Sequence, residues 1–149
     1  MLALGLGTGL SPRAPGTVGT LLGYLLFWPL ARHPLAVQLA VLAVLFAIGV
    51  WACDRTARDL GVADHGSIVW DEIVAFALVL TATPRSPWWF AAAFGLFRLF
   101  DIWKPWPIDY FDRTVKGGFG VMLDDLLAAG YAIAVVQIVA LLIERYMGT

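Results

Sequence analysis

Five carboxylate side chains stand near the ends of apolar stretches in this sequence of 149 residues. They are Asp71, Glu72, Asp101, Asp124 and Asp125. An ionised carboxylate costs about 2.5 to 3.5 kcal/mol at the centre of a membrane helix, so such groups are kept where they meet water, a partner or a metal ion. Clustered carboxylates also repel one another unless cations neutralise them. Because Mg²⁺ prefers oxygen ligands and binds them together with substrate phosphates, the sequence predicts a magnesium site that handles a phosphate group.

For each carboxylate taken alone, an ordinary charge at a helix end is the alternative interpretation. Asp124 and Asp125 would favour a helix N-terminus, and Asp101 lies one turn from Arg98, with which it can pair. The set as a whole weakens this alternative, because a chain with only 14% charged residues places all of these carboxylates at similar depth on neighbouring helices. Two histidines and one cysteine are too few for a typical four-ligand structural zinc site.

Basic and hydroxyl side chains on the same side are candidates for binding the phosphate. Guanidinium groups bind phosphate through paired hydrogen bonds. Arg98 lies deep in its apolar stretch, whereas Arg113 also fits the excess of cations expected in cytoplasmic loops. The opening segment GLGTGLSPRAPGT offers backbone N–H groups before a helix start, where anions are favoured, although such a segment is more often a flexible entry to a membrane helix. The predicted phosphate-binding residues are Thr8, Ser11, Arg13, Thr17, Arg98, Lys104 and Arg113.

The elements that must position these residues are helices in a lipid environment. Hydrophobic residues make up 60% of the chain and charged residues 14%, against about 45 to 50% and about 25% in soluble domains. Windows of about 20 residues, the length that crosses a bilayer, give apolar stretches near 17–31, 35–53, 68–83, 88–103 and 121–143. We therefore expect a single all-α domain over residues 1–149, a polytopic membrane bundle of about four to five helices with short cytoplasmic loops.

Short turns join these stretches into an up-and-down path. The segment ARHP at 31–34 predicts a tight helical hairpin, and TPRSP at 83–87 joins the third stretch to the fourth. On this path seven basic residues fall on one side of the membrane and three on the other. The cation-rich side is expected to be cytoplasmic, so the loops near 1–16, 54–70 and 104–120 and the candidate site would face the cytoplasm.

Three segments together resemble the signature regions of the phosphatidylglycerophosphatase A family. They are GTGLSPRAPGTVGT at 7–20, DHGSIVWDEIVAF at 64–76 and FRLFDIWKPWPIDYFDRTVKGGFGVMLDDLLAAGYA at 97–132. The resemblance implies a Mg²⁺-dependent phosphatase of the bacterial inner membrane that hydrolyses phosphatidylglycerophosphate to phosphatidylglycerol and inorganic phosphate. The family's acidic positions match the same five carboxylates, and its basic positions match Arg98, Lys104 and Arg113.

Two chemical routes fit such a site. A carboxylate would activate water for in-line attack on phosphorus, or an aspartate would form a covalent phosphate intermediate. Direct attack by water is preferred, because the sequence has no DxDx[TV] element to mark a nucleophile.

The same residues also bear on two alternative functions and on the expected partners. A small membrane ion or proton transporter is the alternative function, but its carboxylates are expected nearer the bilayer midplane. A membrane alcohol phosphotransferase is disfavoured, because its DGxxAR...GxxxDxxxD spacing is absent. The net charge of −1 gives no reason to expect a nucleic-acid partner, so phosphatidylglycerophosphate and membrane lipid are the expected partners.

Overall fold

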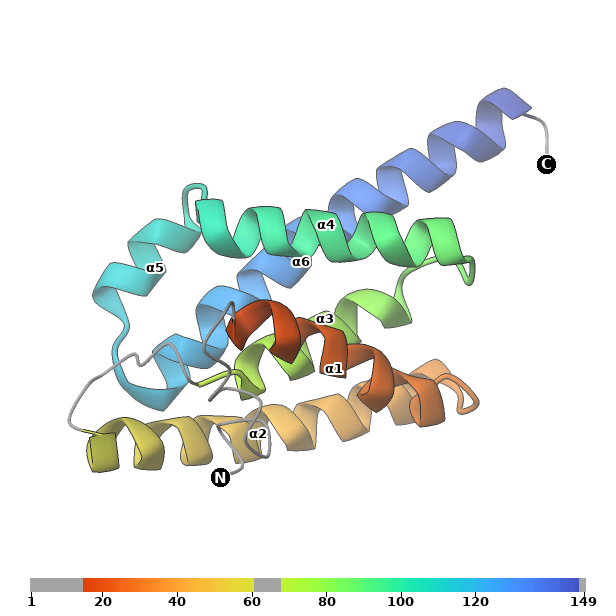
Figure 1. Cartoon of the computed structure of the whole chain (residues 1–149). Helices are drawn as coiled ribbons and strands as arrows, with labels where there is room; N and C mark the ends of the chain where they lie inside the picture. Colours follow the sequence, from red (N-terminus) through yellow and green to blue (C-terminus); the bar gives the residue numbers. More distant parts are fainter. Residues whose placement is uncertain (1–14, 61–67, 148–149) are drawn as a thin grey trace.

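The chain folds as a bundle of α-helices. The computed structural model describes residues 15–60 and 68–147, and within these ranges every regular element is a helix (Figure 1). The helices are α1 Pro15–Leu30, α2 Leu35–Leu60, α3 Trp70–Thr81, α4 Pro87–Trp103, α5 Ile108–Thr114 and α6 Gly117–Met147. The all-α class that the sequence predicts is confirmed.

Helix α5 is an addition to the five helices that cover the five apolar stretches. It lies within residues 104–120, where hydropathy predicts a loop, so that part of the loop prediction is wrong. With 7 residues it is too short to show an apolar period, yet its Ile108 side chain is fully buried. Arg113 Nε donates a hydrogen bond to Asp109 Oδ1 at 2.8 Å, an i,i+4 pair that supports this short helix.

Two tight turns close the end of the bundle that lies away from α5 (Figure 1). The turn between α1 and α2 confirms the predicted hairpin, and Gln38 Nε2 donates to the His33 carbonyl at 2.8 Å beside it. The turn between α3 and α4 leads into Pro87, which suits the first position of a helix. Arg85 Nη2 donates to the Ala31 carbonyl at 2.7 Å, so the two turns are bound to each other.

Helix α3 is the centre of the bundle. It contacts α1, α2, α4 and α6, and most of its side chains are buried. Phe76 is completely buried and packs against the rings of Tyr24 and Phe97. A helix that is apolar on all sides is typical of a protein interior. Asp71 and Glu72, the acidic residues of its first turn, therefore lie inside the bundle as well.

Helices α2 and α6 approach each other closely near the start of α6. A Cβ atom on Gly118 would lie 2.0 Å from the Val50 carbonyl oxygen, so only glycine permits this contact. The Gly118 N–H also donates to Asp54 Oδ1 at 3.4 Å, and this carboxylate therefore caps the start of α6. The two longest helices are fixed together at this point.

Among the helices that the structure describes, two are long and apolar enough to cross a bilayer, judged by length and composition. The segments are Leu35–Thr56 in α2 and Gly117–Tyr146 in α6, with 22 and 30 residues. Helices α1, α3 and α4 have 16, 12 and 17 residues, fewer than the ~20 that a full crossing requires. The C-terminal half of α6 extends beyond the other helices (Figure 1). It exposes apolar side chains such as Leu141. These surfaces fit a membrane-associated bundle.

Candidate active site

One end of the bundle, near α5 and the start of α6, carries all five predicted carboxylates. Asp71 and Glu72 lie in the first turn of α3, Asp101 lies in the last turn of α4, and Asp124 and Asp125 lie in α6. The carboxylates are close enough to repel one another. The charge of Asp71 is opposed by those of Glu72, Asp124 and Asp101, and the charge of Asp125 by those of all four others. The structure therefore brings together, from three helices, the residues that the sequence singles out.

Three of these carboxylates are turned into the protein. Asp71, Asp124 and Asp125 expose only 8%, 6% and 3% of their surfaces. Helix α6 begins at Gly117, where a φ of +80° suits glycine, and about two turns later its two aspartates reach the interior. Burying like charges together is unfavourable, so the cluster requires cations nearby.

Arg98 supplies one of these cations. Its Nη1 donates to Glu72 Oε1 at 3.2 Å and also to Asp101 Oδ2, so one guanidinium links α3 to α4. Arg98 and Asp101 are three positions apart on α4 and therefore share a face of that helix. The Arg98 side chain is only 17% exposed, and its Nε has no hydrogen-bond partner among the residues that the structure describes.

Lys104 supplies the second cation, at the end of α4. Its Nζ donates to Asp112 Oδ1 at 2.8 Å and also to Asp124, and so joins α5 to α6. Burial alone would lower the pKa of Lys104, but the hydrogen bonds and charges of Asp112 and Asp124 outweigh it and raise that pKa above its usual value. Lys104 also has a φ of +46°, the left-handed conformation that ends many helices and favours glycine. Its two ion pairs offset this unfavourable backbone.

Asp112 is a residue of this site that the sequence alone does not single out. It lies eight positions from Lys104, and in one continuous helix that spacing would hold the two about 12 Å apart. The separate helix α5 is what brings them together. Partial burial acts to raise the pKa of Asp112, but the hydrogen bond and charge of Lys104 lower it on balance. Asp112 therefore stays an anion that holds Lys104 in place.

The first turn of α1 closes over the ion pair of Glu72 and Arg98. A Cβ atom on Gly16 would lie 2.1 Å from Glu72 Oε1 and 3.1 Å from Arg98 Nη1. Thr17, a predicted phosphate-binding residue, belongs to the same turn. The other predicted residues of this segment lie outside the described ranges: Thr8, Ser11 and Arg13.

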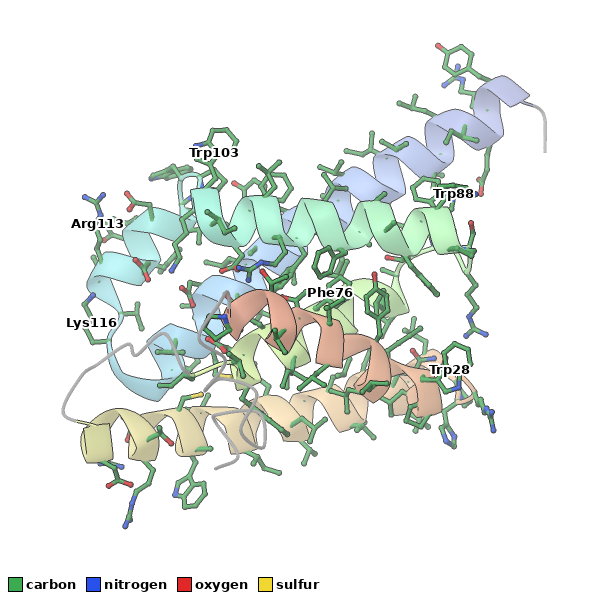
Figure 2. The ribbon with its side chains drawn as sticks, in the orientation of Figure 1. Trp28, Phe76, Trp88, Trp103, Arg113 and Lys116 are labelled. Atoms are coloured by element: carbon green, nitrogen blue, oxygen red, sulfur yellow. The ribbon has the colours of Figure 1, made fainter. Side chains whose placement is uncertain are left out.

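Arg113 lies apart from the carboxylate cluster. Its side chain is 75% exposed, extends away from the bundle and forms an ion pair with Asp109 (Figure 2). Lys116 lies at the same end of the molecule (Figure 2). A contact between Arg113 and a phosphate stays a prediction.

In the described part of the chain, three carboxylate oxygens of the cluster are buried without a hydrogen-bond partner. They are Oδ1 of Asp71, Oε2 of Glu72 and Oδ2 of Asp125. Oxygen donors of this kind suit a hard cation such as Mg²⁺. Within residues 15–60 and 68–147, no three acidic, His or Cys side chains already converge into a metal cage. The donor chemistry fits a divalent cation, and the magnesium site stays a prediction.

Comparison with known proteins identifies the relatives of this chain. The family model described as Phosphatidylglycerophosphatase A matches residues 1–140. Phosphatidylglycerophosphatase A of Escherichia coli (strain K12) is 47% identical over 129 residues, which cover 86% of this chain and 75% of the relative. The protein of the same name from Haemophilus influenzae is 50% identical over 141 residues, which cover 91% of this chain and 85% of the relative.

A relative with a different name is also found. A Bacteroides thetaiotaomicron protein, provisionally named a phosphatidylinositol-3-phosphatase, is 38% identical over 146 residues, which cover 93% of this chain and 91% of the relative. No solved structure matches the chain.

The helical bundle, its exposed apolar surfaces and these relatives define the class of protein, a membrane-associated phosphatase. The prediction of an enzyme that hydrolyses a phosphate ester is thereby confirmed. Within that class, the chain belongs to the phosphatidylglycerophosphatase A family.

Proposed function

We propose that this phosphatase hydrolyses phosphatidylglycerophosphate to phosphatidylglycerol and inorganic phosphate in bacterial phospholipid synthesis, with Mg²⁺ as its cofactor. The observation that carries the proposal is the buried cluster of carboxylates and two cations at one end of an apolar bundle. The names of the two bacterial relatives support the same substrate. A phosphate at head-group depth would reach the cluster while the acyl chains remain in the bilayer.

The five carboxylates would hold the Mg²⁺, with the oxygens of Asp71, Glu72 and Asp125 that have no partner in the described ranges as the first donors. Asp101 and Asp124 already pair with Arg98 and Lys104. When bound, Mg²⁺ would supply positive charge that neutralises the phosphoryl oxygens and makes phosphorus more open to attack.

Arg98 and Lys104 would bind and orient the substrate phosphate. The Arg98 Nε–H has no partner within the cluster, and the raised pKa of Lys104 keeps its ammonium group charged. Both groups would donate hydrogen bonds to nonbridging oxygens and stabilise the negative charge that develops on them. By fixing the phosphate they would also hold phosphorus in line with the attacking water.

The reaction requires a proton acceptor and a proton donor. A water oxygen forms a bond to phosphorus, the bond from phosphorus to the glycerol oxygen breaks, and this oxygen leaves as the glycerol hydroxyl after gaining a proton. A carboxylate of the cluster would take the proton from the water. In the covalent alternative an aspartate would attack first, and labelled phosphate would then be trapped on acid-quenched enzyme.

We further infer a multi-pass protein of the bacterial inner membrane whose site faces the cytoplasm. Exposed tryptophans lie at both ends of the bundle, Trp28 and Trp88 at one and Trp103 at the other (Figure 2). Such rings are typical of the two membrane interfaces. Arg113 and Lys116, at the end that carries the cluster, agree with the excess of cations expected on the cytoplasmic side (Figure 2).

The test is phosphate release from phosphatidylglycerophosphate by the purified protein, with Mg²⁺ and with EDTA. Asp101→Asn removes a proposed ligand, and Asp59→Asn, on an exposed part of α2, is the matched control. Release that requires Mg²⁺ and Asp101, and that survives Asp59→Asn, is the expected result.

Two other results would contradict parts of the proposal. Phosphatidylinositol 3-phosphate is included as a second substrate because of the name of the Bacteroides relative, and a preference for it would refute the proposed substrate. No release from folded protein with any metal would refute the proposed reaction and favour the alternative of a small ion or proton transporter.

A further inference from the structure

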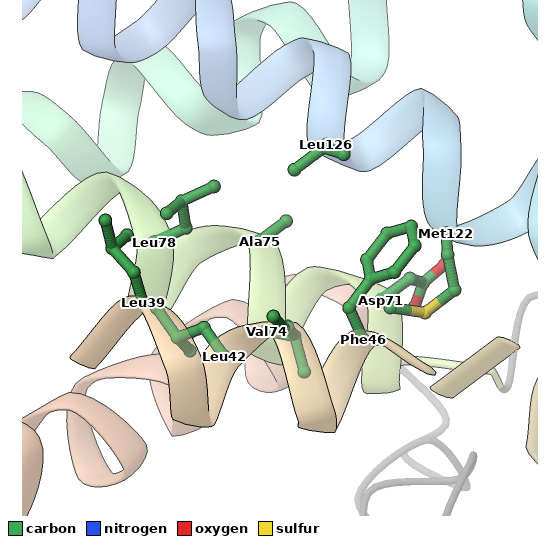
Figure 3. A pocket seen from close by; sticks show the side chains of 10 residues that line it. Leu39, Leu42, Phe46, Asp71, Val74, Ala75, Leu78, Met122 and Leu126 are labelled. Atoms are coloured by element: carbon green, nitrogen blue, oxygen red, sulfur yellow. The ribbon is translucent and has the colours of Figure 1, made fainter. Parts of the chain in front are cut away.

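A cavity of about 290 Å³ lies between α2, α3 and α6. Its walls are formed by apolar side chains of all three helices, such as Leu42, Leu78 and Leu126 (Figure 3). Among the described residues that line it, Asp71 alone is charged. The cavity is therefore an apolar space with a single carboxylate in its wall.

The cavity exists because α2 and α6 meet at one end and then diverge. Gly118 contacts Val50 there, and a Cβ atom on Gly49 would lie 2.7 Å from the Met122 sulfur. Beyond Met122, α6 runs away from α2 (Figure 1), and α3 fills only part of the gap between them. Leu39, on the rim, is 42% exposed, so the cavity opens at the side of the bundle.

The two ends of the cavity differ in polarity. Asp71 lies beside Met122 at one end, while Leu39 and Leu78 line the other (Figure 3). Asp71 is only 8% exposed, and its Oδ1 has no hydrogen-bond partner within residues 15–60 and 68–147. At 1.5 Å per residue, the helix rises about 10 Å from Asp71 to Leu78. This arrangement matches a molecule with a polar end and an apolar tail.

The polar end of the cavity is part of the candidate active site, because the charge of Asp71 interacts with those of Glu72, Asp124 and Asp101. We propose that the cavity binds one acyl chain of the phospholipid substrate, with the head-group end of that chain toward Asp71 and its tail between Leu39 and Leu78. The proposal rests on the proposed function. A volume of about 290 Å³ is just below the range of about 300 to 1,000 Å³ usual for small-molecule pockets, so it suits part of one chain and not a whole diacyl lipid.

A chain in this cavity positions its own head group. The acyl chain enters from the open side of the bundle, and the head group attached to it is then directed toward the carboxylate cluster. Apolar contacts with Leu42, Phe46 and Val74 therefore contribute to substrate binding and not to the chemical step. A substrate without acyl chains gains nothing from these contacts.

The first test fills the cavity. Ala75 is buried in the wall of the cavity, so Ala75→Phe occupies the space, and Ala92→Phe on the exposed face of α4 is the matched control. Both variants are assayed in lipid nanodiscs on two substrates. One is dioleoyl phosphatidylglycerophosphate, and the other is the same molecule without its acyl chains, which keeps the head group and its terminal phosphate. Ala75→Phe should raise KM for the diacyl lipid roughly tenfold, as expected if about two buried CH₂ groups leave the cavity.

The deacylated substrate separates this effect from a disturbed active site. Its hydrolysis should be unchanged in Ala75→Phe, and Ala92→Phe should match the wild type on both substrates. Ala43→Phe, from the opposite wall of the cavity, should reproduce the selective rise in KM. Equal losses on both substrates, or no change on either, would overturn the proposal.

The second test detects the chain directly, without catalysis. Phosphatidylglycerol with a diazirine on one acyl chain is photolysed in nanodiscs with the wild-type protein, and the labelled peptides are identified by mass spectrometry. Adducts should concentrate on the parts of α2 and α3 near Leu39 and Leu78 and should fall in Ala75→Phe but not in Ala92→Phe. Labelling that is spread evenly over exposed residues such as Leu141 would overturn the proposal.

The two tests together separate the cavity from the reaction. If the wild-type protein hydrolyses the lipid but shows neither the labelling nor the selective KM effect, the acyl-chain site is refuted and the proposed function stands. If the cavity is labelled but no phosphate is released, the proposed function is refuted and the cavity remains a binding site for a lipid chain.

Discussion

The backbone of Gly16 lies against the carboxylate of Glu72, so closely that a Cβ atom on Gly16 would be 2.1 Å from Glu72 Oε1. The same Cβ atom would lie 3.1 Å from Nη1 of Arg98, which holds Glu72 in place. Helix α1 thus packs its first turn directly on an ion pair of the candidate site. Any side chain at this position must displace either the helix or the carboxylate.

Gly16→Ala should therefore reduce both stability and activity. Overpacking of a buried contact is destabilising by about 1 to 3 kcal/mol. A displacement of about 1 Å at a reacting centre reduces the rate on the order of 100-fold. Thermal unfolding and phosphate release by the detergent-purified variant measure the two effects.

Gly95→Ala is the matched control for this change. A Cβ atom on Gly95 would meet no atom of the described residues within 4 Å, and the residue lies inside helix α4. Replacing glycine by alanine in a helix interior stabilises by roughly 0.5 to 1 kcal/mol, so this variant should be active and at least as stable as the wild type. Full activity in Gly16→Ala would contradict close packing of α1 on the site.

Asp112 is expected to act as a positioning residue through Lys104. Asp112→Asn removes the negative charge that meets Lys104 Nζ at 2.8 Å, while Asp124 remains as its other partner. We expect a partial loss of activity, roughly tenfold, because the ammonium group loses one of two fixed partners. Asp112→Glu should restore most of the rate, whereas equal losses in both variants would indicate a purely structural role.

The pH dependence of stability gives a second readout for the same pair. The pKa of Asp112 is lowered in the folded protein, so its contribution is present above its ordinary pKa of about 3.9 and is lost as the pH falls through the folded value. The pKa of Lys104 is raised, so its contribution is complete below its ordinary pKa of about 10.4 and is lost as the pH rises through the folded value.

These two directions define a window in which the ion pair is intact. The difference in thermal stability between the wild type and Asp112→Asn should be constant from about pH 5 to about pH 9 and should shrink below about pH 4. Thermal unfolding across this range measures it. A difference that grows on acidification would contradict the assigned ion pair.

The sequence predicts the main helices because each is an apolar stretch bounded by residues that end a helix. The turn at 31–34 separates α1 from α2, and the prolines around 83–87 separate α3 from α4; the structure contains both turns. Helix α5 lacks this signal, since its 7 residues, IDYFDRT, are too few to show a period and are stabilised by contacts with the rest of the bundle. The sequence predicts where a helix lies better than where it ends. Helix α2 continues to Leu60, into the 54–70 region that is expected to form a loop.

The candidate site shows the same division between local and long-range information. The carboxylates could be predicted as a cluster, because the acidic residues of α3 and α4 and the two aspartates of α6 all lie at one end of the bundle. The contact between Lys104 and Asp112 could not, since it depends on the direction of the chain after α4 ends at a left-handed residue. The cavity beside Asp71 likewise depends on the angle between α2 and α6, which no local pattern determines.

Arg98→Lys should reduce activity far more than an exposed Arg→Lys change. The guanidinium binds both Glu72 and Asp101, and its Nε–H has no partner among the described residues. An ammonium group lacks the planar geometry and the length to make all of these contacts. Loss of a preorganised donor to a developing charge lowers kcat by about 10² to 10³. Arg55→Lys, at an exposed pair with Asp59, is the control and should leave kcat unchanged. Equal activities of the two variants would argue that Arg98 is only a structural ion-pair partner.

Binding of Mg²⁺ should be visible in the stability of the protein as well as in its activity. A ligand that binds only the folded state stabilises it by about 2.7 kcal/mol at 100 times its dissociation constant, so Mg²⁺ should raise the melting temperature and EDTA should reverse the change.

Asp125→Asn removes a buried charge that is opposed by four other carboxylates. Without metal this variant should melt above the wild type, because the repulsion is relieved, and it should respond little to Mg²⁺. Asp59→Asn, which is exposed on α2, should keep the full response. A shift that persists unchanged in Asp125→Asn would place the ion outside the carboxylate cluster.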